Sequence, residues 1–360
     1  MTHTADPAPS PEIHKSSLTD GPSEPRAPGS SALKRAFQCL ALVGLLLPLL
    51  TSCKVSSHPV APSPMGQVVS SDELVARLGE PGPVTVETVV AAEWMVDRAG
   101  LINLDHDEAK AHGLTSGDEP IHIAMHVLRH PTRGVYLVDT GVERAFRTDK
   151  GNALIRGFVG SAMNVDAMKV HVDTASYLAA HRIEPRGVLL THLHVDHLTG
   201  MRDIPNQVPV YLGPGETEAR GFMNLFVQGI TDEALEGKGP LLELQYARDP
   251  AGRFAGVIDL FGDSSVFALW VPGHTAGSTA YLARTPDGPV LMVGDACHTA
   301  WGWEHDVEPG TFSNDPDESV VSLRRLRQLV AAHPHINVRL GHQTLPPQAH
   351  ARASQTPKQP

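Results

Sequence analysis

Hydrophobic and polar positions along the chain become periodic from about residue 84. Runs of alternating or β-branched apolar residues predict strands. The runs lie at 84–90, 121–128, 135–139, 187–191, 208–212, 257–261, 266–271, 279–283, 289–293 and 337–340. Between two of them, the stretch Pro286-Asp287-Gly288 predicts a hairpin turn, because Gly adopts positive φ without steric cost.

Three stretches predict helices instead. Residues 166–181 and parts of 215–236 fit the helical period, and 316–332 fits it best because Asp315 can cap and Pro316 suits the first turn. Strand-rich halves that are each joined to helices predict an α/β fold, in which one sheet packs on another and helices lie outside.

The N-terminal region has a different composition. Residues 1–31 are rich in Pro, Ser and Ala and lack an apolar pattern, which predicts a disordered segment. Residues 32–52 predict a secretion signal, because Lys34 and Arg35 precede an apolar run over 37–50 that is too short to span a bilayer comfortably.

The signal ends in Leu50-Thr51-Ser52-Cys53, which resembles the lipobox of bacterial lipoproteins. That resemblance implies that Cys53 carries lipid, so that the protein is exported and anchored in a membrane of the periplasm, the outer membrane or the cell surface. A short buried helix that ends in Cys is the alternative. Residues 53–68 then have the composition of a tether.

The folded domain is predicted to span 69–345, and the polar stretch 346–360 is predicted to be a disordered tail. Of the three cysteines, Cys39 would leave with the signal and Cys53 would carry lipid, so Cys297 remains as a free thiol. The exported domain must therefore be stable through its core or through bound metal.

Charge excludes one class of partner. The 360 residues have a formal net charge of −11, and no run of Lys or Arg reverses this locally. A protein that binds the nucleic-acid backbone is therefore disfavoured, and a small-molecule substrate is expected. The oligomeric state is not determined by these features.

Potential metal ligands are concentrated in residues 189–200, LLTHLHVDHLTG, at the end of a predicted strand. In an extended segment, His192, His194 and Asp196 share one side, and His197 points elsewhere. Two groups of ligands with two directions suggest two neighbouring metal sites. Imidazole and carboxylate suit Zn²⁺, and also Fe²⁺, Mn²⁺ or Co²⁺.

Further ligand-type residues follow other predicted strands, and each comes after a glycine that leaves room for a metal centre: His274, Asp295 and His342. This set, in this order, resembles the metallo-β-lactamase superfamily over most of residues 84–342. The stretch Asp139-Thr140-Gly141 is similar to another motif of that superfamily, whose aspartate supports the metal loop. Within it, the dinuclear N-acyl homoserine lactonases are the most similar group.

The resemblance implies an αββα sandwich that holds two divalent metal ions at one edge. Its first metal site corresponds to His192, His194 and His274, and its second to Asp196, His197 and His342. Asp295 would bridge the two ions. A hydroxide shared by the ions would attack the carbonyl of a lactone or ester, and Asp196 would orient it and move the proton to the leaving group.

One position departs from the lactonase pattern. Those enzymes commonly place a Tyr three residues after the bridging Asp, where this chain has His298, which is expected to donate a hydrogen bond to substrate oxygen in its place. Trp301 and Trp303 would line an acyl groove or pack in the core. A β-lactamase or a thioester hydrolase of the same superfamily, or a lipid-anchored metal-binding protein without turnover, are the alternatives.

Overall fold

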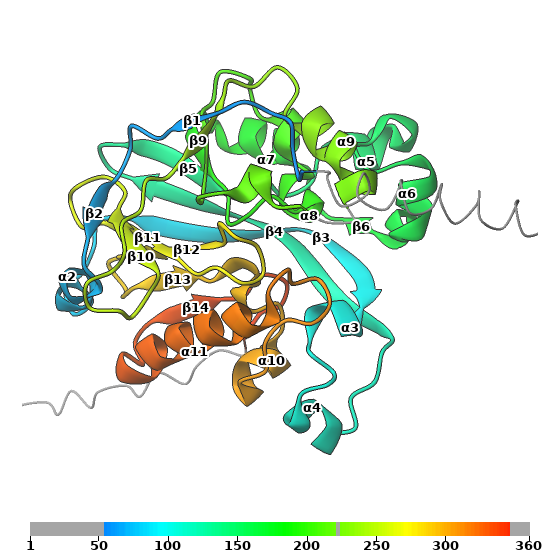
Figure 1. Ribbon diagram of the computed structural model, residues 1–360. Helices are drawn as coiled ribbons and strands as arrows, with labels where there is room; N and C mark the ends of the chain where they lie inside the picture. Colours follow the sequence, from blue (N-terminus) through cyan, green and yellow to red (C-terminus); the bar gives the residue numbers. More distant parts are fainter. Residues whose placement is uncertain (1–53, 221–223, 346–360) are drawn as a thin grey trace, which may run out of the picture. The chain divides into compact units, whose positions relative to one another are not determined.

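The computed structural model describes residues 54–220 and 224–345 (Figure 1). The predicted signal, Cys53 and the predicted tail lie outside these residues. The predicted strands are all present, and they divide between two sheets. None of the described helices is long and apolar enough to cross a membrane.

The first sheet has eight strands. In spatial order they are β1 (Val60–Pro62), β9 (Leu241–Glu243), β8 (Val210–Leu212), β7 (Pro185–Leu189), β5 (Gly134–Val138), β4 (Asp118–His130), β3 (Thr85–Asp97) and β6 (Lys169–Val170). Its helices are α5 (Ala145–Thr148), α6 (Gly157–Ala162), α7 (Thr174–His181), α8 (Val195–Leu198) and α9 (Asn224–Ala234). Strands β5, β7, β8 and β9 pair in parallel, so their carboxyl ends share one edge.

The second sheet has six strands. In spatial order they are β14 (Asn337–Arg339), β13 (Val290–Met292), β12 (Thr279–Ala283), β11 (Val266–Trp270), β10 (Gly256–Asp259) and β2 (Gln67–Val69). Its helices are α2 (Ser71–Arg77), α10 (Ala300–His305) and α11 (Pro316–Ala332). The predicted hairpin turn joins the antiparallel pair β12 and β13, with φ of 110° at Gly288.

Three apolar cores establish the layers. Between the sheets, Leu128 and Leu189 of the first sheet share a core with Ala268 and Tyr281 of the second. A second core lies between the first sheet and α7, and a third between the second sheet and α11 (Figure 1). The predicted αββα sandwich is therefore confirmed.

Two expectations about local structure were wrong. Residues 166–181 do not form one helix, because Asp173 caps α7 by accepting from Ser176 N and the preceding Val170 pairs with β3. The chain over 54–68 is not a tether. It supplies β1 and starts β2, and Val55 N donates to Ala219 O, so these residues belong to the folded domain.

Short connections complete the described chain. An excursion between β3 and β4 carries α3 (Arg98–Leu101) and α4 (Asp107–Ala111), and the carbonyl of Leu101 reaches the candidate site. The 3₁₀ helices are η1 (Lys150–Asn152), η2 (Val165–Ala167), η3 (Met201–Asp203), η4 (Glu216–Glu218) and η5 (Gly294–Ala296). Two of them, η4 and η5, follow strands and contribute carboxylates to the site described next.

Candidate metal centre

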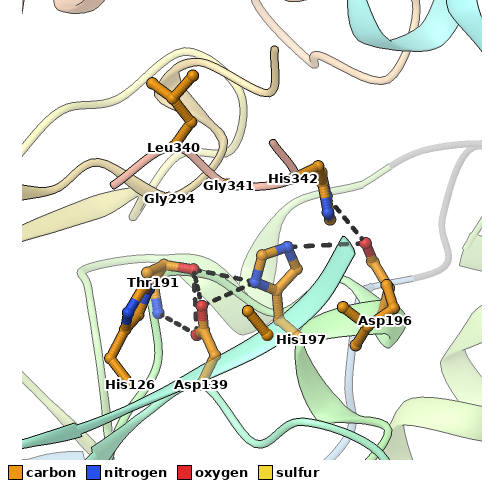
Figure 2. A pocket seen from close by; sticks show the side chains of 11 residues that line it. His126, Asp139, Thr191, Asp196, His197, Gly294, Leu340, Gly341 and His342 are labelled. Atoms are coloured by element: carbon orange, nitrogen blue, oxygen red, sulfur yellow. Dashed lines mark hydrogen bonds and ion pairs between the residues drawn. The ribbon is translucent and has the colours of Figure 1, made fainter. Parts of the chain in front are cut away.

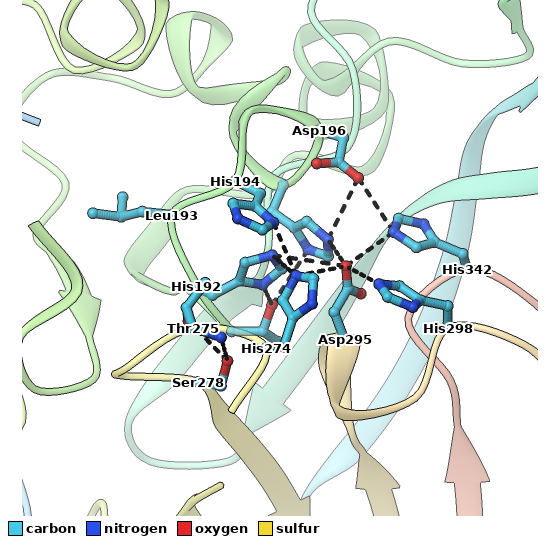
Figure 3. Close-up of polar contacts among 12 residues, drawn as sticks. His192, Leu193, His194, Asp196, His274, Thr275, Ser278, Asp295, His298 and His342 are labelled. Carbon is cyan, nitrogen blue, oxygen red and sulfur yellow. Dashed lines mark hydrogen bonds and ion pairs between the residues drawn. The ribbon is translucent and has the colours of Figure 1, made fainter. Parts of the chain in front are cut away.

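The residues predicted to bind metal lie where strands end. His192 and His194 follow β7, His274 follows β11, Asp295 lies in η5 after β13, and His342 follows β14. Helix α8 begins directly after His194 and carries the remaining two predicted ligands. The structure brings these side chains together at one edge of the two sheets (Figure 3).

The side chains form two groups that share one carboxylate. Four potential ligand atoms within 4.8 Å of one another define the three-histidine group: His192, His194, His274 and Asp295. Four others within the same limit define the two-aspartate group: Asp196, His197, Asp295 and His342. Two groups with Asp295 in common agree with the predicted grouping.

The local geometry behind this grouping differs from the extended segment that the sequence suggested. Because α8 begins at Val195, the chain turns helically there, and Asp196 lies beside His197 instead of beside His192. The Nε2 atom of His197 is 3.7 Å from Oδ2 of Asp196. One loop therefore supplies histidines to the first group and a helical turn supplies ligands to the second.

A single oxygen lies at the centre of the cluster. Oδ2 of Asp295 is 3.1 to 3.7 Å from the Nε2 atoms of five imidazoles, contributed by His192, His197, His274, His298 and His342 (Figure 3). The Asp295 side chain is only 3% exposed, so these groups are shielded from bulk solvent. Such convergence of basic nitrogens on one buried carboxylate is typical of a metal centre.

Unpaired polar atoms support the same interpretation. Oδ1 of Asp295 and Nε2 of His197 are buried without a hydrogen-bond partner among the described residues. Nε2 of His274 lies 2.9 Å from Nδ1 of His194, so two ring nitrogens face each other. Lone pairs directed at a common point suit a divalent cation, whereas unpaired buried polar atoms are otherwise costly. The residues therefore fit the metal ions that the fold implies.

Electrostatics differ between the groups. Burial lowers the pKa of His192 and of His274 well below the ordinary value, and also lowers the pKa of His194. These three imidazoles are neutral at pH 7, with lone pairs available to a cation. Burial would also lower the pKa of His342, but the charges of Asp295 and Asp196 outweigh it and raise this pKa to about 10.

Glu216 supports the three-histidine group, and the sequence analysis missed it. Its carboxylate accepts from Leu193 N at 2.9 Å, between the two histidines of the metal loop. It also accepts from Gly277 N at 2.7 Å and from the Thr275 hydroxyl, beside His274. Burial raises the pKa of Glu216, while these donors stabilise its charged form. The sequence feature that could have identified Glu216 is its position directly after Gly215, in the loop that follows β8.

Asp139 supports the two-aspartate group, as the sequence predicted. It has φ of 57°, a left-handed conformation that Asp tolerates, at the end of β5. Its Oδ2 lies 2.8 Å from Nδ1 of His197, and its Oδ1 accepts from Thr191 N at 2.8 Å (Figure 2). Because Nδ1 donates to this carboxylate, Nε2 of His197 is left free to bind metal.

Two of the glycines that precede ligands lie where a larger residue would not fit. A Cβ on Gly341 would overlap the Asp295 carboxylate, so this glycine does leave room for the centre. Gly273 has φ of 135°, and a Cβ there would overlap the backbone of Ser319 in α11. Its reason is thus the packing of the His274 loop on a helix.

The remaining candidates are His298, Cys297 and the two tryptophans. His298 is buried and contacts Asp295, so the structure places it at the site. Burial raises the pKa of the Cys297 thiol to about 12, which keeps this thiol protonated at pH 7. Trp303 is 8% exposed and belongs to the core beneath α11, whereas Trp301 stacks on His305 at 4.3 Å. Trp303 therefore packs in the core.

Comparisons with known proteins place this fold and site in a family. Residues 120–342 match the metallo-beta-lactamase superfamily. The chain belongs to this superfamily.

Among relatives, the N-acyl homoserine lactonase AttM of Rhizobium johnstonii is 27% identical to this superfamily member over 251 residues, which cover 68% of this chain and 90% of the relative. AttM of Agrobacterium fabrum is 26% identical, covering 66% and 88%. A solved N-acyl homoserine lactone hydrolase, with the product N-hexanoyl-L-homoserine bound at its catalytic metal centre, aligns with a TM-score of 0.51. At 20% identity, covering 73% of this chain and 93% of that one, this likeness concerns the fold.

Proposed function

We propose that this protein is a metal-dependent hydrolase that opens a lactone or ester, with N-acyl homoserine lactones as the leading substrate class. The observation that carries the proposal is the convergence of five imidazole nitrogens on Oδ2 of Asp295. The named activity of the AttM relatives supports the choice of lactones.

The centre would hold two divalent ions, with Zn²⁺ favoured and Fe²⁺, Mn²⁺ or Co²⁺ compatible with its ligands. Three-histidine and two-aspartate groups would each hold one ion, and Asp295 would contact both. When bound, such a pair lowers the pKa of a shared water, so that hydroxide is available near neutral pH.

Asp196 is the residue that we propose to handle the proton. Its side chain is 20% exposed, against 3% for Asp295, so it is the more accessible carboxylate of the centre. Its Oδ2 lies 3.2 Å from Nε2 of His342, which holds the carboxylate in place. From this position Asp196 can orient the attacking water and pass a proton to the departing alkoxide.

A substrate screen with the full-length protein tests the proposal. Protein loaded with Zn²⁺ or Co²⁺ would be given lactones of different acyl length, esters, thioesters, β-lactams and phosphodiesters, and acid release would be followed. We expect turnover of lactones or esters, and its loss in Asp196→Asn. Turnover of β-lactams or thioesters alone would retain the superfamily and overturn the lactone assignment. Bound metal without any turnover would favour the metal-binding alternative.

We also propose that lipid on Cys53 anchors the exported protein. Because Lys54 already pairs with Glu218 and Ser56 bonds Asp232 of α9, such an anchor would leave almost no tether between lipid and domain. The protein should then partition with membranes, and Cys53→Ala should release it. A wild-type protein that is soluble after export, or that still begins at Met1, would show that the lipobox interpretation is wrong.

A further inference from the structure

His298 holds its ring in an orientation that matters for metal binding. It lies between η5 and α10 and is 1% exposed. Its Nδ1 is 3.0 Å from the carbonyl oxygen of Leu101, at the end of α3. A carbonyl can only accept a hydrogen bond, so Nδ1 carries a proton and donates it to Leu101. The opposite nitrogen, Nε2, then faces the cluster.

His342 has the same arrangement. Its Nδ1 is 2.9 Å from the carbonyl oxygen of His122 in β4, and its Nε2 is 3.2 Å from Oδ2 of Asp295. For His298 the corresponding distance to that oxygen is 3.1 Å. The two rings are nearly parallel, at 12°, with centroids 5.5 Å apart (Figure 3). Two imidazoles that are fixed alike point at the same carboxylate oxygen.

In this geometry Nδ1 of His298 is used on Leu101 and is not available to a substrate. Its Nε2 is 3.1 Å from Oδ2 of Asp295, the carboxylate that the two ligand groups share. Both side chains are buried, so Nε2 is directed at the cluster and away from solvent. An imidazole whose Nδ1 is fixed by a carbonyl and whose Nε2 faces the centre has the arrangement typical of a metal ligand.

We propose that His298 is a further metal ligand, which gives the centre six imidazoles and two carboxylates. The inference rests on the proposed metal centre and adds to it a residue that the two ligand groups do not contain. It also assigns a task to the excursion between β3 and β4, since Leu101 sets the tautomer of the ligand. An additional nitrogen would favour Zn²⁺ or Co²⁺ over Mg²⁺ or Ca²⁺.

The test is a metal titration of the full-length protein with a matched pair of variants. His298→Asn places an amide N–H where Nδ1 lies, which retains a donor for Leu101 but removes Nε2. His130→Asn makes the same change at a histidine whose side chain is 2% exposed and which bonds Asp263 instead of the cluster. Each stripped protein would be titrated with Zn²⁺ against a competing chelator, and with Co²⁺ while the visible spectrum is recorded.

We expect His298→Asn to bind one ion at least about tenfold more weakly than wild type and to change the cobalt spectrum, whereas His130→Asn does neither. His298→Gln, whose amide oxygen can reach toward the position of Nε2, should recover part of the affinity, which guards against a variant that misfolds. Wild-type affinity and spectrum in His298→Asn, with turnover alone reduced, would overturn the inference in favour of a donor role. Wild type that binds no metal would overturn the proposed function itself.

Discussion

The three-histidine and two-aspartate groups share Asp295 but are built differently. The first consists of neutral imidazoles, of which His192 and His274 are buried and His194 is half-buried, on two loops that Glu216 joins. The second comes from a helical turn and a strand end, where burial is outweighed by carboxylate charge and the pKa of His197 is raised well above its ordinary value. Asp139 holds that histidine from behind.

The two groups meet the requirements for a metal ligand in different ways. A metal ligand must be deprotonated and correctly oriented. In the three-histidine group, burial removes the proton and a second carboxylate aligns the loops. In the two-aspartate group, negative charge attracts a cation strongly but also attracts protons, so metal and protons compete. Substitutions that affect only one group test whether the two groups differ in metal affinity and in its pH dependence.

The largest effect is expected from Asp295→Ala, because this residue belongs to both groups. Loss of a partner outside the ligand shell typically lowers affinity or activity by about 10–100-fold. Loss of a ligand shared by two ions should exceed that, and both ions should be depleted. Elemental analysis and hydrolysis rates measure it.

Cys297→Ala is the control for Asp295→Ala, because it alters a buried neighbour and should lower the free energy of unfolding by only about 1 kcal/mol. Similar large losses of metal in both variants would place the thiol among the ligands and contradict the assignment.

Substitution of single ligands should separate the groups. His194→Ala should deplete the ion of the three-histidine group, and His342→Ala the ion of the two-aspartate group, because each side chain belongs to one group only. Each variant should retain close to one ion per chain by elemental analysis. Their cobalt spectra, one from each remaining group, should differ. Loss of both ions in both variants would show that the centre forms only as a unit.

The supporting carboxylates should have smaller and selective effects. Glu216→Gln weakens the acceptor for Leu193 and Gly277, and should lower metal affinity at the three-histidine group by about 10–100-fold. Asp139→Asn should do the same at the two-aspartate group through His197. Chelator competition measures the loss of affinity, and comparison with the cobalt spectra of the single-ligand variants shows which group has lost it. Equal depletion of both ions by Glu216→Gln would disprove its selective role.

The two groups should also differ in the pH dependence of metal binding. The pKa of metal-free His342 is raised to about 10, so at pH 7 this imidazole must release a proton before it binds metal. Affinity of the two-aspartate group should therefore rise with pH, by about tenfold per unit for each proton released, up to about pH 10. The three-histidine group, with lowered pKa values, should change little above pH 7. Titrations between pH 6 and 9 in His194→Ala and His342→Ala measure each slope, and equal slopes would contradict the comparison.

Much of the fold could be predicted because its signals are local. Strand β12 coincides with the run 279–283, and α11 coincides with 316–332, since alternation and a capping residue act within a few positions. The metal loop was also evident, because several ligand types lie close together after one strand. Distant ligands were found through their place after other strands and through the family resemblance.

Other elements carry no such signal. Strands β1 and β2 have only three residues each and lie at sheet edges, where β1 pairs with β9 and β2 with β10. Their positions depend mainly on backbone pairing with a partner strand, and Val69 of β2 also packs against the core of the second sheet. Composition alone therefore suggested a tether. Glu216 was missed for a related reason, since a single acidic residue after a strand is usually a solvated turn.

By itself, the sequence determined which residues alternate along strands and which side chains at the strand ends can bind metal, because both depend on near neighbours and on the chemistry of each side chain. Only the tertiary structure decided that Asp196 pairs with His197 through α8, that Glu216 joins the loops of Leu193 and Gly277, and that His298 turns its Nε2 toward Asp295. These outcomes depend on how distant backbone segments are oriented, and that is set by the packing of two sheets and by carbonyls such as Leu101 that no side-chain pattern specifies.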